Sequence, residues 1–402
     1  MHSNKYVDIC PVGMKKNIFI FLWLCTGLYA LGAKLPTLTE KAQISVLTCS
    51  SGDVLYTAFG HTAFRVQDTS LGIDVVYNYG TFDFDQPNFY LNFAKGKLIY
   101  SLSRRSFEGF LYGYELEKRW VKEQLLNLSQ QETNALFALF EKDYRPENRD
   151  YAYDPLFNNC STITGDILKD RLGSDVVFHD THLKQLYTFR QLVHQYIDSN
   201  TWGAFGIDLA FGGITDKTAT LRQHMFLPYY AMDQLDNASI KGEPLVLRER
   251  SILDYADIRY RSHFLTTPLF WFLAVLLFVS VITYIDIKHN SRSRWLDFAL
   301  FFSSGMAGLI VMLLWFATNH KVTELNFNFL WLLPLNLLVS FALLRAKEQP
   351  VWLGIYVKMA LGLMVMAIII WIIGIQIISP LNIVLMLVLA TRYLFLLKMA
   401  KA

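Results

Sequence analysis

The chain has 402 residues, of which 53% are hydrophobic and 15% aromatic, and its formal net charge is +3. This composition is too apolar for an ordinary soluble protein, and the modest charge without a basic stripe argues against nucleic acid as a partner. The apolar excess is concentrated after residue 264, whereas residues up to about 260 carry charge at ordinary density. The sequence therefore predicts a soluble domain followed by a membrane domain.

The first segment has the pattern of a secretory signal peptide. Met14 and two lysines precede an apolar run at residues 18–31, which ends in small residues at 32–33. A basic start, a short apolar run and a small-residue end are typical of such peptides. Residues 1–33 are therefore predicted to be a signal peptide, with Met14 as a candidate for the natural start. An uncleaved anchor is the alternative, although the run is short for one.

Residues 40–260 are enough for one domain of ordinary size. Alternation of apolar and polar residues predicts antiparallel strands at 44–48, 62–66, 75–79 and 97–103. Amphipathic patterns then predict helices at 120–128, 129–140, 160–172 and 183–197. Two of these helices have clear start signals, because Ser129 with Glu132 forms a capping box and Asn159 is a good N-cap before Cys160. This mixture of elements predicts an α+β domain.

The membrane domain, residues 265–398, contains a series of runs that are apolar on all faces, unlike soluble helices. Each run approaches the roughly 20 residues needed to cross a bilayer. The five predicted spans are 265–285, 295–316, 328–344, 353–378 and 381–397. Basic residues gather after the first, third and fifth spans, and the positive-inside rule places those links in the cytoplasm. The soluble domain then lies on the outer side and the C-terminus lies in the cytoplasm.

Cys160 is the residue most informative about function, because it begins a predicted helix about a hundred residues after Gly60-His61. A thiol is a useful nucleophile as thiolate, and both a helix N-terminus and a nearby imidazole lower its pKa. Other roles remain open at this point. Cys160 is alternatively a buried small hydrophobe or half of a disulfide with Cys49, and a lone histidine beside apolar residues is more often structural.

The order of these residues resembles that of a known group of enzymes. A strand histidine, further strands and a helix-starting cysteine resemble the circularly permuted papain-like thiol enzymes. This group includes lecithin:retinol acyltransferase-like proteins and relatives of the NlpC/P60 peptidases. Residues 60–66, 77–84, 158–162 and 226–228, with a five-helix membrane domain, are also similar to the Lnb family of lipoprotein N-acyltransferases. The resemblance covers roughly residues 40–398. It implies a periplasmic permuted papain-like domain followed by an all-α five-helix transmembrane domain in the bacterial inner membrane.

The resemblance also implies roles for individual residues. Cys160 is expected to be the nucleophile and His61 its base, with a third group orienting the imidazole. Asn78 is the expected third group, and Asp83 is the alternative. The candidate substrate-binding residues are Tyr79, Asn159, His320, Asn326 and Asn328. The last three fall at the outer ends of the second and third spans, where they either hold lipid head groups or represent ordinary interfacial polarity.

The activity implied by the resemblance is acyl transfer at the membrane. An acyl chain would move from a membrane phospholipid to a Cys160 thioester, and then to the α-amine of the N-terminal diacylglyceryl-cysteine of lipoproteins. No metal or nucleotide cofactor is expected, because the sequence has no Cys-x-x-Cys, His-x-x-x-His or P-loop motif. Two alternatives are a membrane-anchored cysteine hydrolase, acting on peptidoglycan peptides or phospholipids, and a non-enzymatic assembly factor with a Cys49–Cys160 disulfide.

Overall fold

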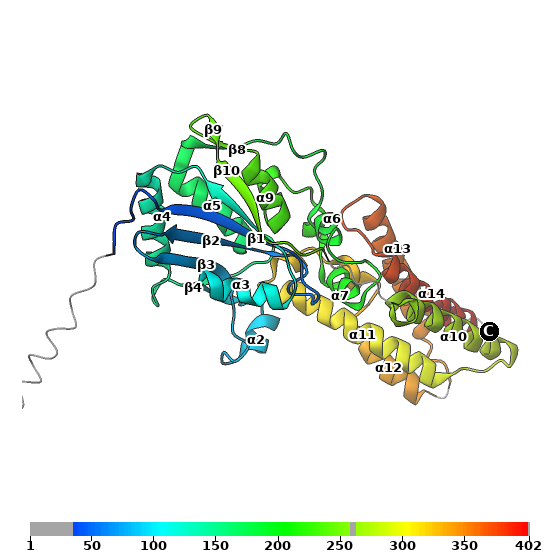
Figure 1. Cartoon of the computed structure of the whole chain (residues 1–402). Coiled ribbons are helices and arrows are strands. Elements are labelled where there is room, and N and C mark those ends of the chain that lie inside the picture. Colours follow the sequence, from blue (N-terminus) through cyan, green and yellow to red (C-terminus); the bar gives the residue numbers. More distant parts are fainter. Residues whose placement is uncertain (1–34, 258–262, 347, 401–402) are drawn as a thin grey trace, which may run out of the picture. The chain divides into compact units, whose positions relative to one another are not determined.

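The computed structural model describes residues 35–257, 263–346 and 348–400. It divides into two compact units, residues 1–38 and residues 39–402, and each is considered by itself. The predicted signal peptide at residues 1–33 lies outside the described residues. The second unit contains both a sheet-bearing domain and a group of long helices (Figure 1).

A seven-stranded antiparallel sheet forms the centre of the soluble domain. In spatial order its strands are β10 (Val246–Leu253), β5 (Val121–Leu126), β1 (Gln43–Cys49), β2 (His61–Asp68), β3 (Ile73–Thr81), β4 (Ile99–Ser106) and β6 (Asp150–Ala152). The meander predicted from alternating residues is therefore confirmed as β1 to β4. Successive residues of β1 and β2 are buried. Because side chains of a strand alternate between faces, both faces of this sheet must be covered.

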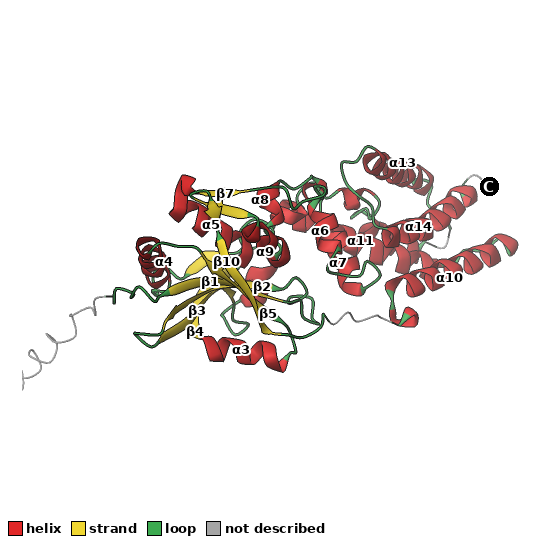
Figure 2. Ribbon diagram, turned by 45° about the horizontal axis from the view of Figure 1, so that its top comes forward, coloured by secondary structure: helices red, strands yellow, loops and turns green. Residues whose placement is uncertain are grey.

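Helices supply that cover (Figure 2). On one face lie α4 (Gln130–Asp143), α5 (Cys160–Leu172) and α9 (Pro228–Asp236), and on the other lies α3 (Phe107–Leu116). The ring of Phe140 on α4 packs against Phe64 and Tyr77, at centroid distances of 4.8 and 5.0 Å. The capping box predicted at Ser129 is present at the start of α4. Packing of α5 on β2 and β3 brings the first residues of α5 to these two strands.

Shorter elements complete the domain. They are α2 (Phe89–Ala94), α6 (Phe189–His194), α7 (Trp202–Ala210), α8 (Leu221–His224), a small sheet of β7 (Val176–Phe178), β8 (Ala238–Ile240) and β9 (Glu243–Pro244), and the 3-10 turns η1 (Gly173–Asp175) and η2 (Gly213–Asp216). The helix predicted at 183–197 is thus wrong in its first part. Thr188 caps α6 with a capping box, so the helix begins only at Phe189.

The helix predicted at 120–128 is wrong, because this segment is strand β5. It pairs with β1 on one side and β10 on the other. Glu123 on β5 is buried, and it accepts hydrogen bonds from Arg65 at 3.0 Å and Arg250 at 2.5 Å. The segment is rich in residues that favour helices, and pairing within the sheet overrides that local preference.

Four helices of the described chain are long and apolar enough to cross a membrane. They are α10 (Pro268–Lys288), α11 (Arg294–Phe316), α13 (Leu353–Ile372) and α14 (Pro380–Met399). The third predicted span, 328–344, differs: the 3-10 turn η5 (Phe327–Leu330) is followed by the short helix α12 (Asn336–Arg345). Pro334 precedes α12, and proline cannot continue a helix that begins before it. Two further 3-10 turns, η3 (Phe264–Thr266) and η4 (Lys321–Thr323), precede α10 and follow α11.

Small and paired polar residues hold these helices together. A Cβ atom on Gly305 or Gly308 of α11 would collide with the backbone of residues 332–337, so glycine permits the close approach of α11 to that segment. Arg392 on α14 is fully buried, and it pairs with Asp286 at 2.8 Å and Asp297 at 2.5 Å. A charged side chain inside an apolar bundle needs such partners.

Candidate active site

Cys160 is the first residue of α5, as the sequence predicts, and Asn159 caps the helix. The Asn159 side-chain oxygen accepts from the N–H groups of Ser161 and Thr162, at 2.9 and 3.0 Å. Its Nδ2 donates to the carbonyls of Pro155 and Phe226, both at 2.8 Å. Asn159 is also buried. Every polar atom of its side chain is thus used to fix the start of α5, and its role as a substrate contact stays a prediction.

His61 lies at the start of β2, where the pairing of β2 with β3 has ended. The last matched pair between the two strands is Phe64 with Tyr77. The backbone N–H of Thr62 and the His61 imidazole both stabilise negative charge on the Cys160 sulfur and so act to lower its pKa. The hydroxyl of Thr62 lies 2.8 Å from the hydroxyl of Ser161. The opening between β2 and β3 thus receives the beginning of α5.

Asn78 on β3 holds the other side of the imidazole. Its Oδ1 lies 2.5 Å from His61 Nε2. A carbonyl oxygen can only accept, so Nε2 carries a proton here and Nδ1 is the nitrogen left for Cys160; this tautomer is assigned from the hydrogen-bond network. The alternative orienting group, Asp83, is exposed and accepts from the N–H of Asp85 at 2.9 Å. The structure therefore brings Cys160, His61 and Asn78 together and leaves Asp83 outside.

The two reacting groups change each other's pKa. Burial acts to raise the pKa of Cys160, but the charge of His61 and hydrogen bonds from His61, Thr62 and Ser161 outweigh it, so the pKa is lowered. Burial acts to lower the pKa of His61, but the charge and hydrogen bond of Cys160 and the hydrogen bond of Asn78 raise it. Both directions favour a thiolate–imidazolium pair, which is the reactive form of a catalytic cysteine.

Cys49 lies next to this pair without taking part in it. It is opposite His61 in the register of β1 and β2, and its side chain is fully buried. Burial raises its pKa to about 12, although a hydrogen bond with Tyr114 and the charge of Arg119 oppose this rise. Cys49 and Cys160 are both free thiols in the structure, so the disulfide considered as an alternative is not formed there.

Two residues at the site were not singled out from the sequence, Gly80 and Tyr151. Gly80 has φ +97°, and a Cβ built on it would lie 3.7 Å from Cys160 Cβ, 3.8 Å from His61 Cε1 and 3.9 Å from the Tyr151 hydroxyl oxygen. The Tyr151 hydroxyl is buried and finds no hydrogen-bond acceptor in the described ranges. Gly80 could have been found from the sequence, because it is a glycine inside the motif at residues 77–84. Nothing local distinguishes Tyr151 from its neighbour Tyr153.

The thiol is also next to unused hydrogen-bond donors. Among the described residues around the start of α5, the N–H groups of Asn159, Ser161 and Thr162 have side-chain acceptors, whereas that of Cys160 is not used in this way. The Tyr151 hydroxyl and the Cβ atom of Cys160 both border the space that Gly80 leaves open. Two preorganised donors beside a nucleophile can stabilise negative charge on a carbonyl oxygen.

Tyr79 lies in the wall of a cavity of about 220 Å³ beside the site. Tyr151 lines the same cavity, with Asp143 and Arg149 contributing opposite charges. The Tyr79 hydroxyl donates to Asp143 at 3.0 Å, and its ring meets that of Tyr151 edge to face. Tyr79 is therefore close to the site, with its hydroxyl already engaged. Its role as a substrate contact remains a prediction.

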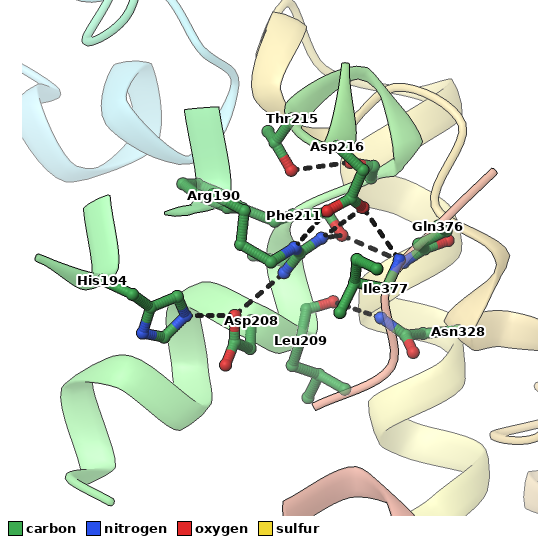
Figure 3. A network of polar contacts seen from close by, with 12 residues as sticks. Arg190, His194, Asp208, Leu209, Phe211, Thr215, Asp216, Asn328, Gln376 and Ile377 are labelled. Atoms are coloured by element: carbon green, nitrogen blue, oxygen red, sulfur yellow. Dashed lines mark hydrogen bonds and ion pairs between the residues drawn. The ribbon is translucent and has the colours of Figure 1, made fainter. Parts of the chain in front are cut away.

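The three polar residues predicted at the outer ends of the second and third spans contact other parts of the same chain. Asn326 and Asn328 are buried, and their Nδ2 atoms donate to the Leu209 carbonyl at 2.9 and 3.3 Å. Figure 3 shows the contact of Asn328. Their side-chain oxygens accept from other groups of the chain. All side-chain polar atoms of these two residues have partners within the chain, and the head-group contact stays a prediction. His320 Nε2 is 2.8 Å from the Phe93 carbonyl oxygen.

Asn326 and Asn328 belong to a junction between the soluble domain and the membrane helices, and Figure 3 shows Asn328 with the residues at its centre. At its centre, the buried Arg190 pairs with Asp208 at 2.9 Å and with Asp216 at 2.7 Å. Asp216 also accepts from the N–H of Ile377, at 3.0 Å, just before α14. The junction was not predicted, because its members are scattered over nearly two hundred residues of sequence.

The geometry can now be compared with known proteins. Residues 37–195, which include the sheet from β1 to β6 and the site at Cys160, match the family model of the Lnb N-terminal periplasmic domain. Residues 260–402, which include α10 to α14, match the model of the Lnb transmembrane domain. No curated protein and no solved structure matches the chain significantly. The chain belongs to the Lnb family, and is thus a membrane-bound acyltransferase of lipoprotein biogenesis with a periplasmic domain.

Proposed function

We propose that this protein transfers an acyl chain from a membrane phospholipid to the N-terminal amine of diacylglyceryl lipoproteins through a thioester on Cys160. The observation that carries the proposal is the position of the His61 imidazole, which lies between Asn78 and the thiol at the start of α5. A nucleophile, a base and a group that orients the base are the parts required for covalent acyl transfer.

In the first step, the Cys160 thiolate attacks the carbonyl carbon of a phospholipid ester. The carbonyl oxygen gains negative charge, which the Cys160 N–H and the Tyr151 hydroxyl stabilise. When the carbon–oxygen bond to glycerol breaks, the leaving oxygen takes a proton from the His61 imidazolium. The lysophospholipid departs, and the acyl group remains on sulfur as a thioester.

In the second step, the neutral α-amine of the lipoprotein attacks the thioester carbonyl carbon. His61, now neutral, accepts the proton that the nitrogen loses. The carbon–sulfur bond breaks, the amide is released, and the thiolate–imidazolium pair is restored. Because an amide is more stable than a thioester, the transfer is downhill without a further energy source.

The membrane helices fit these substrates, because donor and acceptor both reside in the bilayer. We place the soluble domain on the periplasmic side of the inner membrane and the C-terminus in the cytoplasm. Basic residues support this orientation. Lys288 lies at the end of α10, Arg292 lies between α10 and α11, and Lys398 lies near the end of α14. A simple peptidase would need at most one anchor.

The test is lipoprotein analysis in a strain depleted of its own N-acyltransferase. Mass spectrometry of lipopeptides is expected to find triacyl product with the wild type and diacyl product with Cys160→Ala or His61→Ala. Cys49→Ala is the matched control and is expected to keep the triacyl product. Tyr151→Phe, which removes only the hydroxyl oxygen, is expected to lower the rate by about 10². Diacyl product with the wild type would refute the proposal, and fatty acid release in its place would favour the hydrolase.

A further inference from the structure

A group of large apolar side chains is exposed on the soluble domain although it belongs to no described core. The group, here named the aromatic rim, consists of Leu55, Tyr56, Tyr90, Leu91, Phe93 and Trp202, which are 46% to 74% exposed. Three of its members come from α2, a helix with no buried residue. So short a helix with an apolar surface gains little stability in water, and an exposed apolar patch of this kind marks an interaction surface.

The aromatic rim and its flanking residues form hydrogen bonds with the segments that precede α10 and follow α11. After α11, the N–H of Asn319 donates to the Lys95 carbonyl at 2.9 Å, directly after α2. Figure 1 shows α2 beside the end of α11. Gly96 meets the backbone of this same loop so closely that no side chain would fit. The rim therefore lies at the level where α11 ends.

A second attachment joins the rim to the start of α10. The indole N–H of Trp202 donates to the Thr266 carbonyl at 2.9 Å, two residues before α10 begins. Leu55 packs on Gly203, the next residue of α7. Thus the loop between β1 and β2, the start of α7 and helix α2 all lie at one level relative to the membrane helices.

Lipid is the occupant that this position favours. Trp271 on α10 and Phe316 at the end of α11 are 52% and 67% exposed, so the rim continues the exposed apolar surface of those two helices. Aromatic side chains at the end of a membrane helix belong to the boundary between head groups and acyl chains. A soluble protein partner at the same place would have to displace lipid.

Aromatic rings connect the rim to the thiol. Tyr56 contacts Phe82 at a centroid distance of 6.2 Å, and Phe82 contacts Tyr100 at 5.0 Å. Tyr100 stacks on Tyr153 at 4.1 Å, and Tyr153 lies close enough to Cys160 to be affected by its charge. The loop that carries Tyr56 also leads directly into Gly60 and His61. A series of contacting aromatic rings thus extends from the aromatic rim towards the reacting sulfur.

We propose that the aromatic rim enters the outer leaflet and receives the acyl chain of the donor phospholipid, so that its ester carbonyl reaches Cys160. This proposal rests on the proposed function, since it names the route by which the first substrate reaches the same thiol. The aromatic rim delivers bilayer lipid, and the residues around Cys160 carry out the acyl transfer.

The test compares two acyl donors on the full-length protein in vesicles of phosphatidylethanolamine and phosphatidylglycerol. Leu55→Asp and Leu91→Asp place a charge on the rim, and Leu71→Asp is the matched control. Leu71 is 44% exposed and lies in the turn between β2 and β3, at the end of β2 that is far from His61. Formation of acyl-Cys160 from vesicle phospholipid is expected to fall about tenfold or more in the rim variants, because a buried charge opposes insertion. Acylation by water-soluble p-nitrophenyl acetate is expected to change by less than about twofold.

The outcomes separate this proposal from the proposed function. An equal loss with both donors, or no loss with phospholipid, would overturn the rim proposal and leave the thiol chemistry intact. A wild type that forms no acyl-Cys160 with either donor would overturn the proposed function and the rim proposal with it.

A second measurement tests insertion without activity. A polarity-sensitive fluorophore is attached at Leu91→Cys in a chain whose other cysteines, apart from the buried Cys49, are replaced. Its emission is expected to shift to the blue in vesicles and to be quenched by nitroxide lipids, whereas the same label at Leu71→Cys stays in water. Equal spectra at the two positions would contradict the proposal.

Discussion

The thiol of Cys160 and the imidazole of His61 shift each other's pKa in opposite directions, and both shifts serve the two steps of the reaction. A lowered thiol pKa supplies thiolate near neutral pH for attack on the ester. The same lowered pKa makes the sulfur a better leaving group when the amine attacks the thioester. A raised imidazole pKa keeps a proton available for the departing glycerol oxygen.

The first prediction at the residue scale concerns the pH dependence of thiol modification. Because the pKa of Cys160 is lowered, its thiolate persists to a pH below that of an ordinary thiol. Alkylation by iodoacetamide, followed by mass spectrometry, is expected to be half-maximal at a lower pH than for an ordinary exposed cysteine. His61→Ala removes the stabilising charge and hydrogen bond, so its midpoint is expected to rise.

Cys49 is an internal control for this experiment. Burial raises the pKa of Cys49 to about 12, so its peptide is expected to stay unmodified while the protein is folded. Identical midpoints for Cys160 in the wild type and in His61→Ala would contradict the proposed pairing.

The second prediction concerns the open space at Gly80. Gly80→Ala is expected to slow acylation of Cys160 by about tenfold or more. A loss of this size is comparable to the loss of one oriented catalytic group. The added methyl would contact Cys160 and His61 and occupy the space beside the Tyr151 hydroxyl. Gly72→Ala is the matched control, because its φ of +65° carries similar strain and a Cβ there meets nothing within 4 Å. Equal rates for the two variants would show that the space at Gly80 is not used.

At the scale of elements, the start of α5 joins stability to function. Asn159→Ala removes an N-cap, which costs about 1 kcal/mol, and also removes the contacts with Pro155 and Phe226. Ser129→Ala at α4 is the control cap. Both variants are expected to lower the melting temperature. A rise in the alkylation midpoint of Cys160 is expected only in Asn159→Ala, since only that cap fixes the thiol. The same rise in Ser129→Ala would show that a general loss of stability, and not the cap at Asn159, changes the alkylation midpoint of Cys160.

The elements also show how far local sequence signals reach. The starts of α4 and α5 were predicted, because a cap is decided by residues that are neighbours in the chain. Strand β5 was predicted as a helix, because its partners Arg65 and Arg250 are far away in sequence. The third membrane span was predicted as continuous, whereas the structure has a turn and α12 there. For β5, contacts with distant residues outweigh the local pattern, whereas Pro334 is a local signal for the interruption of the third span.

At the scale of the whole molecule, the Arg190 junction holds the soluble domain on the membrane helices. Arg190→Met would leave Asp208 and Asp216 buried without their partner, a change that costs about 3–5 kcal/mol. The melting temperature is therefore expected to fall, and phospholipid-dependent acylation of Cys160 is expected to fall more than acylation by p-nitrophenyl acetate. A smaller loss with phospholipid than with the soluble ester would argue against a positioning role.

Arg222→Met provides the control for the junction variant. Arg222 and Asp166 form an ion pair whose side chains are 43% and 50% exposed, and exposed pairs contribute about 0–1 kcal/mol. Little change is expected in melting temperature or in either reaction. A loss as large as that of Arg190→Met would indicate that any ion pair of the domain has this effect.

The two-part organisation, four membrane helices and the cap at Asn159 can be predicted from the sequence, and the family resemblance implies the pairing of Cys160 with His61. Hydrophobic runs, capping residues and motif order are local properties of the chain, so they can be read without coordinates. Only the folded structure shows that Asn78 and not Asp83 reaches the imidazole, that Gly80 and Tyr151 border the thiol, and that Asn326 and Asn328 are buried in a junction. These outcomes depend on which distant segments meet, and that is fixed by the packing of the whole molecule.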